Sequence, residues 1–203
     1  MNKIFFRFFV TGLVLVLFLA GCGGYNEITL HKDVPATAGW EPDYPETIVV
    51  YDSWSGNTGR IAKVIAEELA APAVKVDKVD EYNMDDFDLI VVRSPVHGGA
   101  PTGEIEDFLT ALSRPPLSAV FVTFGAPGFG PATANACLDK MEKKLQKTSL
   151  GRFKCRGFHH IMRTYPDHPN EEDMAKAAQF AVELRELCLN AKKSKAPAEN
   201  KAD

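Results

Sequence analysis

Between residues 47 and 189, short runs of apolar residues alternate with longer segments in which apolar residues recur every three or four positions. The short runs predict five β-strands, at 47–51, 73–76, 88–93, 119–124 and 157–161. The longer segments predict helices at 59–69, 103–112, 132–147 and 171–189. Alternating strands and helices form a parallel sheet with helices on both faces, so the pattern predicts a doubly wound α/β domain. Ligands of such domains bind at the carboxyl ends of the strands.

The first 21 residues have the order of a secretion signal. Lys3 and Arg7 precede an almost wholly apolar run at 8–19, and Leu19-Ala20-Gly21-Cys22 follows it. This tetrapeptide resembles the lipobox of bacterial lipoproteins. The resemblance implies cleavage before Cys22, with diacylglycerol on its thiol and an acyl group such as palmitate on its new amino terminus. Because several acyl chains hold a protein stably, we expect an extracytoplasmic protein that is lipid-anchored to a bacterial membrane. An uncleaved anchor is the alternative.

The segments on either side of the predicted domain have no clear apolar period. Residues 22–46 are expected to be the lipidated Cys22 and a tether, and Lys- and Ala-rich residues 191–203 a disordered tail, which leaves 47–190 for the domain. The formal net charge of −4 argues against a nucleic-acid partner. Acidic residues gather after the second predicted strand, where they form a solvated edge or attract a basic redox partner: Asp77, Asp80, Glu81, Asp85, Asp86 and Asp88.

Neither the cysteines nor the histidines form a recognisable framework. If Cys22 carries lipid, three cysteines remain that cannot all pair within one chain, so buried free thiols are expected and one disulfide stays open: Cys137, Cys155 and Cys188. The histidines of the domain lack the spacing of metal ligands, so no metal is expected: His97, His159, His160 and His168.

Three polar or glycine-rich loops follow the first, third and fourth predicted strands. The first, Ser53-Trp54-Ser55-Gly56-Asn57-Thr58, opens a helix whose unpaired N–H groups suit a phosphate group. An ordinary helix cap is the alternative. The other two combine backbone amides with aromatic rings, which suit the rim and faces of a planar heteroaromatic ligand. They are Ser94-Pro95-Val96-His97-Gly98-Gly99 and Thr123-Phe124-Gly125-Ala126-Pro127-Gly128-Phe129-Gly130.

The first loop resembles the phosphate loop of the flavodoxin family, whose pattern is Ser/Thr-x-Ser/Thr-Gly-Asn-Thr, and the other two stand where that family's flavin-flanking loops lie. The resemblance implies a short-chain flavodoxin-like fold, with a five-stranded parallel sheet of order 2-1-3-4-5 and noncovalent FMN. It assigns the FMN phosphate to Ser53, Ser55, Gly56, Asn57 and Thr58. It assigns the isoalloxazine ring to Pro95, Val96, His97 and Gly98. It assigns the rim of the ring and the ribityl side to Thr123, Gly125, Phe129 and Gly130. Trp54, Gly99 and Phe124 of the same loops are also expected to bind the cofactor.

The resemblance implies an electron carrier that works with a redox partner protein or a quinone. His97 departs from the family, because many flavodoxins have Trp or Tyr there. Two other functions stay open. One is an FMN-dependent quinone or protoporphyrinogen oxidoreductase of the same fold. The other is a non-catalytic lipoprotein that has lost the flavin. The sequence assigns neither a catalytic residue nor an oligomeric state.

Overall fold

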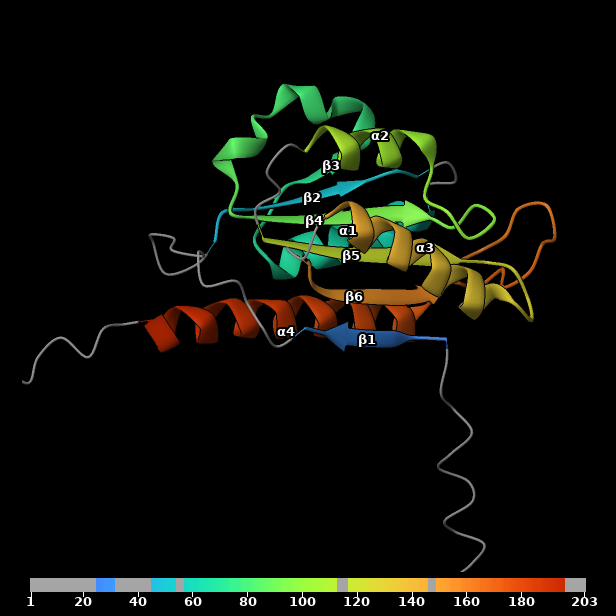
Figure 1. The fold of residues 1–203 in the computed structure, drawn as a ribbon. Helices are drawn as coiled ribbons and strands as arrows, with labels where there is room; N and C mark the ends of the chain where they lie inside the picture. The colour runs from blue at the N-terminus through green and yellow to red at the C-terminus, as the bar shows by residue number, and fades with distance from the viewer. Residues whose placement is uncertain (1–24, 32–44, 54–56, 113–116, 146–148, 196–203) are drawn as a thin grey trace, which may run out of the picture.

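A six-stranded sheet lies at the centre of the computed structural model, which describes residues 25–31, 45–53, 57–112, 117–145 and 149–195 (Figure 1). The strands, in the order β1-β6-β5-β4-β2-β3 across the sheet, are β1 (Glu27–Leu30), β6 (Ser149–Arg156), β5 (Leu117–Phe124), β4 (Leu89–Pro95), β2 (Thr47–Tyr51) and β3 (Ala73–Lys75). The helices are α1 (Asn57–Glu68), α2 (Gly103–Ala111), α3 (Gly130–Lys144) and α4 (Glu171–Lys195). Two short 3₁₀ helices, η1 (Val76–Glu81) and η2 (Met84–Asp86), join β3 to β4.

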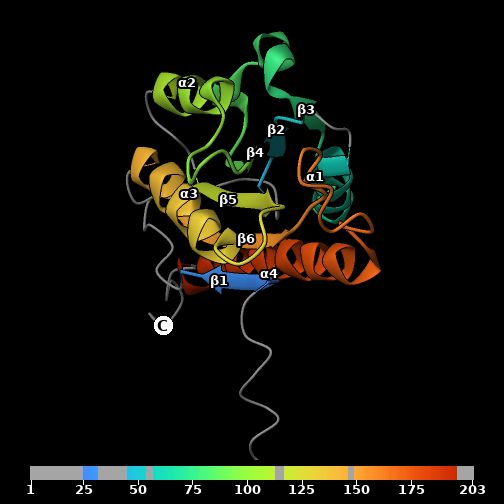
Figure 2. The same cartoon turned by 90° about the vertical axis from the view of Figure 1, so that its right-hand side faces the viewer.

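Five strands are parallel and confirm the predicted α/β fold. Their order β3-β2-β4-β5-β6 is the expected 2-1-3-4-5. Most of β2 and β4, and all of β5, are buried, because helices cover both faces of the sheet. Figure 2 shows α2 and α3 on one side and α1 and α4 on the other. Each pair of helices encloses its own apolar core.

The last parallel strand is β6, and the prediction of a strand at 157–161 is wrong. β6 carries Arg152, Lys154 and Arg156, so it lacks the apolar run that marks the other parallel strands. Lys154 is nevertheless only 3 % exposed, because its ammonium group contacts Glu27 at 2.7 Å and Asn135 at 2.6 Å. Residues 157–161, rich in aromatic and β-branched side chains, lie instead in the loop that leaves the sheet.

The sixth strand, β1, lies within the segment that was expected to be a tether. It pairs antiparallel with β6, and Glu27 lies opposite Lys154. The backbones come so close that a Cβ on Gly151 would lie 2.8 Å from the carbonyl oxygen of Thr29. β1 therefore covers the edge of the parallel sheet that β6 would otherwise expose.

The last helix begins where the sequence predicts. Asn170 and Asp173 cap it reciprocally, because the Asn170 N–H donates to the Asp173 carboxylate and the Asp173 N–H donates to the Asn170 side-chain oxygen. Its backbone runs to Lys195, six residues past the predicted end, and so includes part of the expected disordered tail. The signal segment, Cys22 and residues 196–203 lie outside the described residues.

Candidate functional site

The first of the three predicted loops leads directly into a helix, as the sequence predicts. β2 ends at Tyr51 and α1 begins at Asn57. Trp54, Ser55 and Gly56 lie outside the described residues, as do the side chains of Asn57 and Thr58. The described geometry of this part of the site is therefore the amino end of α1, at the carboxyl edge of the sheet, where backbone N–H groups and the helix dipole favour an anion.

The second loop is a tight hairpin. His97 and Ala100 exchange two backbone hydrogen bonds of 2.9 Å each, with Gly98 and Gly99 between them. Both glycines have positive φ, +55° and +80°, the combination that a type I′ turn requires at its two central residues. The turn carries exposed His97 and Gly98 to the rim of the site.

A cavity of about 500 Å³, the edge cavity, lies between the second loop, the third loop and the loop after β6. It brings together seven of the predicted site residues: Pro95, Val96, His97, Gly98, Thr123, Phe124 and Gly125. Five residues that the sequence analysis placed outside the site complete its lining: Gly157, Phe158, His159, His160 and Ile161. The sequence analysis assigned these residues to a strand ending at 161, but β6 ends five residues earlier, at Arg156, so they lie in the loop at the carboxyl edge.

Ser53 of the first loop does not line the edge cavity, and neither do three of the residues predicted in the second and third loops. Phe129 is exposed, and Gly99 lies against α3, where a Cβ would meet Ala136 at 3.5 Å. Gly130 is buried beneath Phe124, whose ring would be 2.7 Å from a Cβ. A glycine is therefore needed at position 130 because the Phe124 ring packs against it, and not because a ligand needs the space.

Arg93 is a residue of the site that the sequence analysis missed. It lies on β4 at the carboxyl edge and is fully buried. Its guanidinium donates to the backbone carbonyl of Asp52 and, at 2.5 Å, to the Thr123 hydroxyl. Its Nε has no hydrogen-bond partner among the described residues, and burial lowers the pKa of Arg93 to about 9. An arginine that follows the apolar run 89–92 was the signal in the sequence.

Arg93 thus places a positive charge between the ends of β2 and β5, beside the first loop. Within the described part of the chain it has no carboxylate partner within ion-pair distance. The nearby Asp52 carboxylate favours the charged form of Arg93 and balances part of this charge, but it makes no ion pair with the guanidinium. Together with the amino end of α1, the remaining positive charge favours a negatively charged ligand at this edge.

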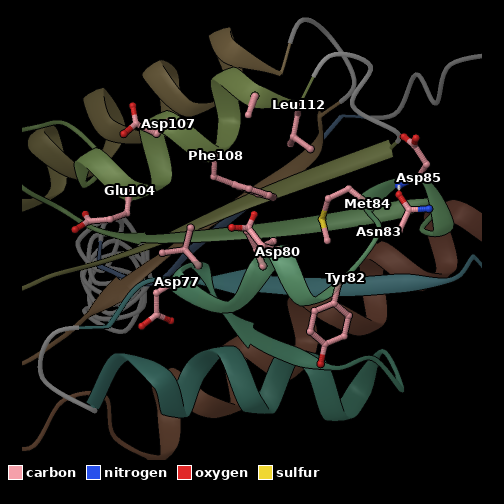
Figure 3. A pocket seen from close by; sticks show the side chains of 13 residues that line it. Asp77, Asp80, Tyr82, Asn83, Met84, Asp85, Glu104, Asp107, Phe108 and Leu112 are labelled. Carbon is pink, nitrogen blue, oxygen red and sulfur yellow. Dashed lines mark hydrogen bonds between the residues drawn. The ribbon is translucent and has the colours of Figure 1, made fainter.

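A second hollow, the acidic groove, has a volume of about 510 Å³ and lies between α2 and the two 3₁₀ helices (Figure 3). Its walls carry acidic side chains, and Phe108 and Met84 contribute apolar surface between them. The acidic residues that line it are Asp77, Asp80, Asp85, Glu104 and Asp107. Two other members of the predicted acidic cluster have local roles, because Asp86 accepts a hydrogen bond from Asn83 and Asp88 accepts one from the Glu46 N–H. Among the described residues, none lines both the groove and the edge cavity.

Cys137, Cys155 and Cys188 are free and buried. Among the described residues, no cluster of three His, Cys, Asp or Glu side chains could hold a metal ion. Within the same residues, no helix has both the length and the apolar character needed to cross a membrane.

Comparison with known proteins gives three kinds of relative. Residues 48–167 match the model of a family described as a flavodoxin domain. An uncharacterized protein of Methanocaldococcus jannaschii is 35 % identical over 135 residues, which are 63 % of this chain and 89 % of that protein.

Two solved structures have the same fold. A flavodoxin, WrbA-like protein from Agrobacterium tumefaciens has a TM-score of 0.54 at 18 % identity, covering 73 % of this chain and 99 % of its own. A flavodoxin from the domain Archaea has a TM-score of 0.51 at 16 % identity, covering 70 % of this chain and 98 % of its own.

Proposed function

The chain belongs to the flavodoxin family, whose cofactor is FMN. We propose that it is an FMN-binding electron-transfer protein that lipid on Cys22 holds at a membrane surface. The edge cavity is the observation that carries the proposal. It lies at the carboxyl edge of the sheet, where doubly wound domains bind their ligands, and its volume of about 500 Å³ suits a cofactor ring.

The residues of this edge fit FMN. The phosphate has two complementary partners, the amino end of α1 and the buried charge of Arg93, whose Nε has no partner among the described residues. The aromatic side chain of Phe158 and the backbone of the Gly98 hairpin suit the ring and its rim. Bound FMN would supply the capacity to accept and release one or two electrons.

The chain itself binds and orients the cofactor. Thr123 and the Asp52 carbonyl hold the Arg93 guanidinium at the end of the sheet, so its charge is fixed before a ligand arrives. Loops from three neighbouring strands enclose the edge cavity, and exposed His97 stands at its open side. A redox partner would approach at this open side.

Titration with FMN and with riboflavin, which lacks the phosphate, tests the cofactor site. The full-length protein in detergent should bind FMN. The visible absorption bands of the bound FMN should disappear on reduction and return on reoxidation. The Arg93→Met variant should bind FMN about 10- to 100-fold more weakly, because a contact to a charged group contributes about 1.5–3 kcal/mol, while its affinity for riboflavin stays within about twofold. The Arg185→Met variant is the control, since Arg185 contacts the Glu68 carbonyl at the other end of α1. A wild-type protein that binds no FMN would refute the proposal.

Mass spectrometry of the mature protein tests the anchor. We expect a chain that begins at Cys22 and carries the mass of acyl groups, and we expect that mass to be missing from a Cys22→Ser variant. An unmodified thiol at Cys22 in wild-type protein isolated from membranes would contradict lipid anchoring.

A second candidate, FMN-dependent quinone reduction, is favoured by one observation. Ile161 lines the edge cavity and is 90 % exposed, and its neighbour Met162 is 50 % exposed, so an apolar acceptor would meet apolar side chains at the entrance. Saturable oxidation of the reduced protein by a soluble quinone, weakened by Ile161→Ser, would support this reaction. Linear dependence of the rate on quinone concentration in both proteins would count against it.

A further inference from the structure

Large apolar side chains are exposed at one edge of the molecule. Five such side chains are exposed among the described residues, and four of them belong to loops at the carboxyl edge of the parallel strands. These four form what we call the apolar edge: Tyr25, Phe129, Ile161 and Met162, with exposed fractions of 44 %, 64 %, 90 % and 50 %. The fifth, Tyr82, lines the acidic groove. Apolar side chains that gather on a surface mark a site of interaction with a partner or a membrane.

The position of Tyr25 ties the N-terminal segment to this edge. Because β1 is antiparallel to β6, its beginning lies where the parallel strands end, as Figure 1 shows. The Tyr25 ring stacks on Phe124 at 6.4 Å, and the Arg156 guanidinium lies 3.4 Å from the ring centroid. The Tyr165 ring centroid lies 4.7 Å from the same guanidinium, so Arg156 interacts with both tyrosine rings.

We propose that the apolar edge inserts into the interface of the lipid bilayer to which Cys22 is anchored, so that the edge cavity opens at the membrane surface. This inference rests on the proposed lipidation of Cys22. In the sequence Cys22 precedes Tyr25 by three residues, which span at most about 11 Å. A lipid on Cys22 would therefore hold the apolar edge, and not the opposite edge of the sheet, next to the bilayer.

The chemistry of the apolar edge fits a membrane interface. Tyr and Phe rings and long aliphatic side chains are the groups that enter the boundary between headgroups and acyl chains. The acidic groove lies beside β3, at the other end of the strand order from β1. Asp77 closely follows β3 and Glu104 lies in the first turn of α2, so these carboxylates also lie at the carboxyl edge, and the width of the sheet separates them from Tyr25. Because carboxylates are costly to desolvate, the proposed insertion is confined to the side of that edge formed by β1 and β6.

Depth-dependent quenching of tryptophan tests the inference in the mature, lipidated full chain reconstituted into phosphatidylcholine vesicles. Reporters are introduced as Ile161→Trp and, separately, Phe129→Trp, and Tyr82→Trp serves as the matched control. The emission of Trp40 and Trp54 is measured in the parent protein and subtracted. Vesicles with brominated acyl chains should reduce the emission of both apolar-edge reporters about twofold or more relative to plain vesicles, while the Tyr82→Trp reporter is unchanged.

Each alternative has its own outcome. Protein that floats with the vesicles but shows equal quenching at positions 161 and 82 would overturn the inference and leave lipid anchoring intact. Protein that does not float would refute the anchor, and with it the inference. Emission at position 161 that shifts to the blue with protein concentration in the absence of vesicles would identify a second copy of the chain as the occupant and would also overturn the inference. FMN titration is independent of all three outcomes, so the proposed cofactor is judged separately.

Discussion

The glycines of the site are required for two different physical reasons. Gly98 has a φ of +55°, but a Cβ built on it would meet no atom within 4 Å. At Gly125 a Cβ would lie 2.8 Å from the carbonyl oxygen of Gly157 and 2.7 Å from the His159 Cβ. The first position needs only an unusual backbone angle, whereas the second needs the absence of a side chain, because the loop after β6 packs directly on it.

Alanine substitutions should separate these two requirements. We expect Gly98→Ala to lower the free energy of unfolding by about 1 kcal/mol, the cost of a left-handed residue with a side chain. Gly125→Ala should cost about 3 kcal/mol or more, because backbone must move to relieve the clash. Urea denaturation measures both. Equal losses in the two variants would show that the contact at Gly125 is not tight.

Residue types predicted part of the lining of the edge cavity. Glycine and proline marked the second and third loops, and the cavity brings Pro95, Gly98 and Gly125 together. Arg93 is marked in the sequence only by its place after the apolar run 89–92, and no local pattern predicts that its guanidinium contacts the Asp52 carbonyl after the neighbouring strand β2. Gly130 looked like part of the ligand site, but it makes room for Phe124.

Among the elements, strands were predictable where their side chains are uniformly apolar. The bounds of β2, β4 and β5 agree with prediction to about two residues, because these strands are buried on both faces. β6 was misplaced because its charged residues have partners that are remote in sequence: Lys154 pairs with Glu27, and Arg152 pairs with Asp139 at 2.5 Å. β1 is only four residues long and depends on the same pairing, so no local signal predicts it.

Glu27→Gln tests how much β1 depends on this pairing. The variant removes the carboxylate that faces Lys154, a cation that is 3 % exposed, and should lower the free energy of unfolding by about 1–2 kcal/mol. Amide hydrogen exchange of residues 27–30 should also become faster. Glu67→Gln, at an exposed position of α1, is the control and should change stability by less than about 0.5 kcal/mol. A β1 that stays equally protected would show that backbone pairing alone holds it.

For the whole molecule, the buried thiols predict how stability depends on pH. Burial raises the pKa of Cys188 from 9.0 to about 12 in the folded protein. Above pH 9 the unfolded chain releases this proton while the folded protein keeps it, so the free energy of unfolding falls as the pH rises. Each such thiol contributes a slope of about 1.4 kcal/mol per pH unit in this range. Arg93 acts in the opposite sense, because burial lowers its pKa to about 9 and the unfolded chain keeps the proton longer.

Cys188→Ala should therefore make the loss of stability above pH 9 less steep, by up to about 1.4 kcal/mol per pH unit. Denaturation in urea at pH 7, 9, 10 and 11 with a reductant present gives the slope. The cavity left by the thiol lowers stability at every pH and does not affect that comparison. If the free energy of unfolding falls equally steeply with pH in the wild type and the variant, the Cys188 thiol has the same pKa in the folded and unfolded protein.

The pairing of β1 with β6 has a practical consequence for expression. The family match starts at residue 48, and a gene trimmed to that boundary would lack β1. In such a product β6 would be an unpaired edge strand, whose free backbone groups could pair with another molecule. Lys154 would also lose its ion pair with Glu27. Expressed proteins intended for crystallisation or spectroscopy should therefore begin before Tyr25, so that β1 is present to cover the edge of the sheet at β6.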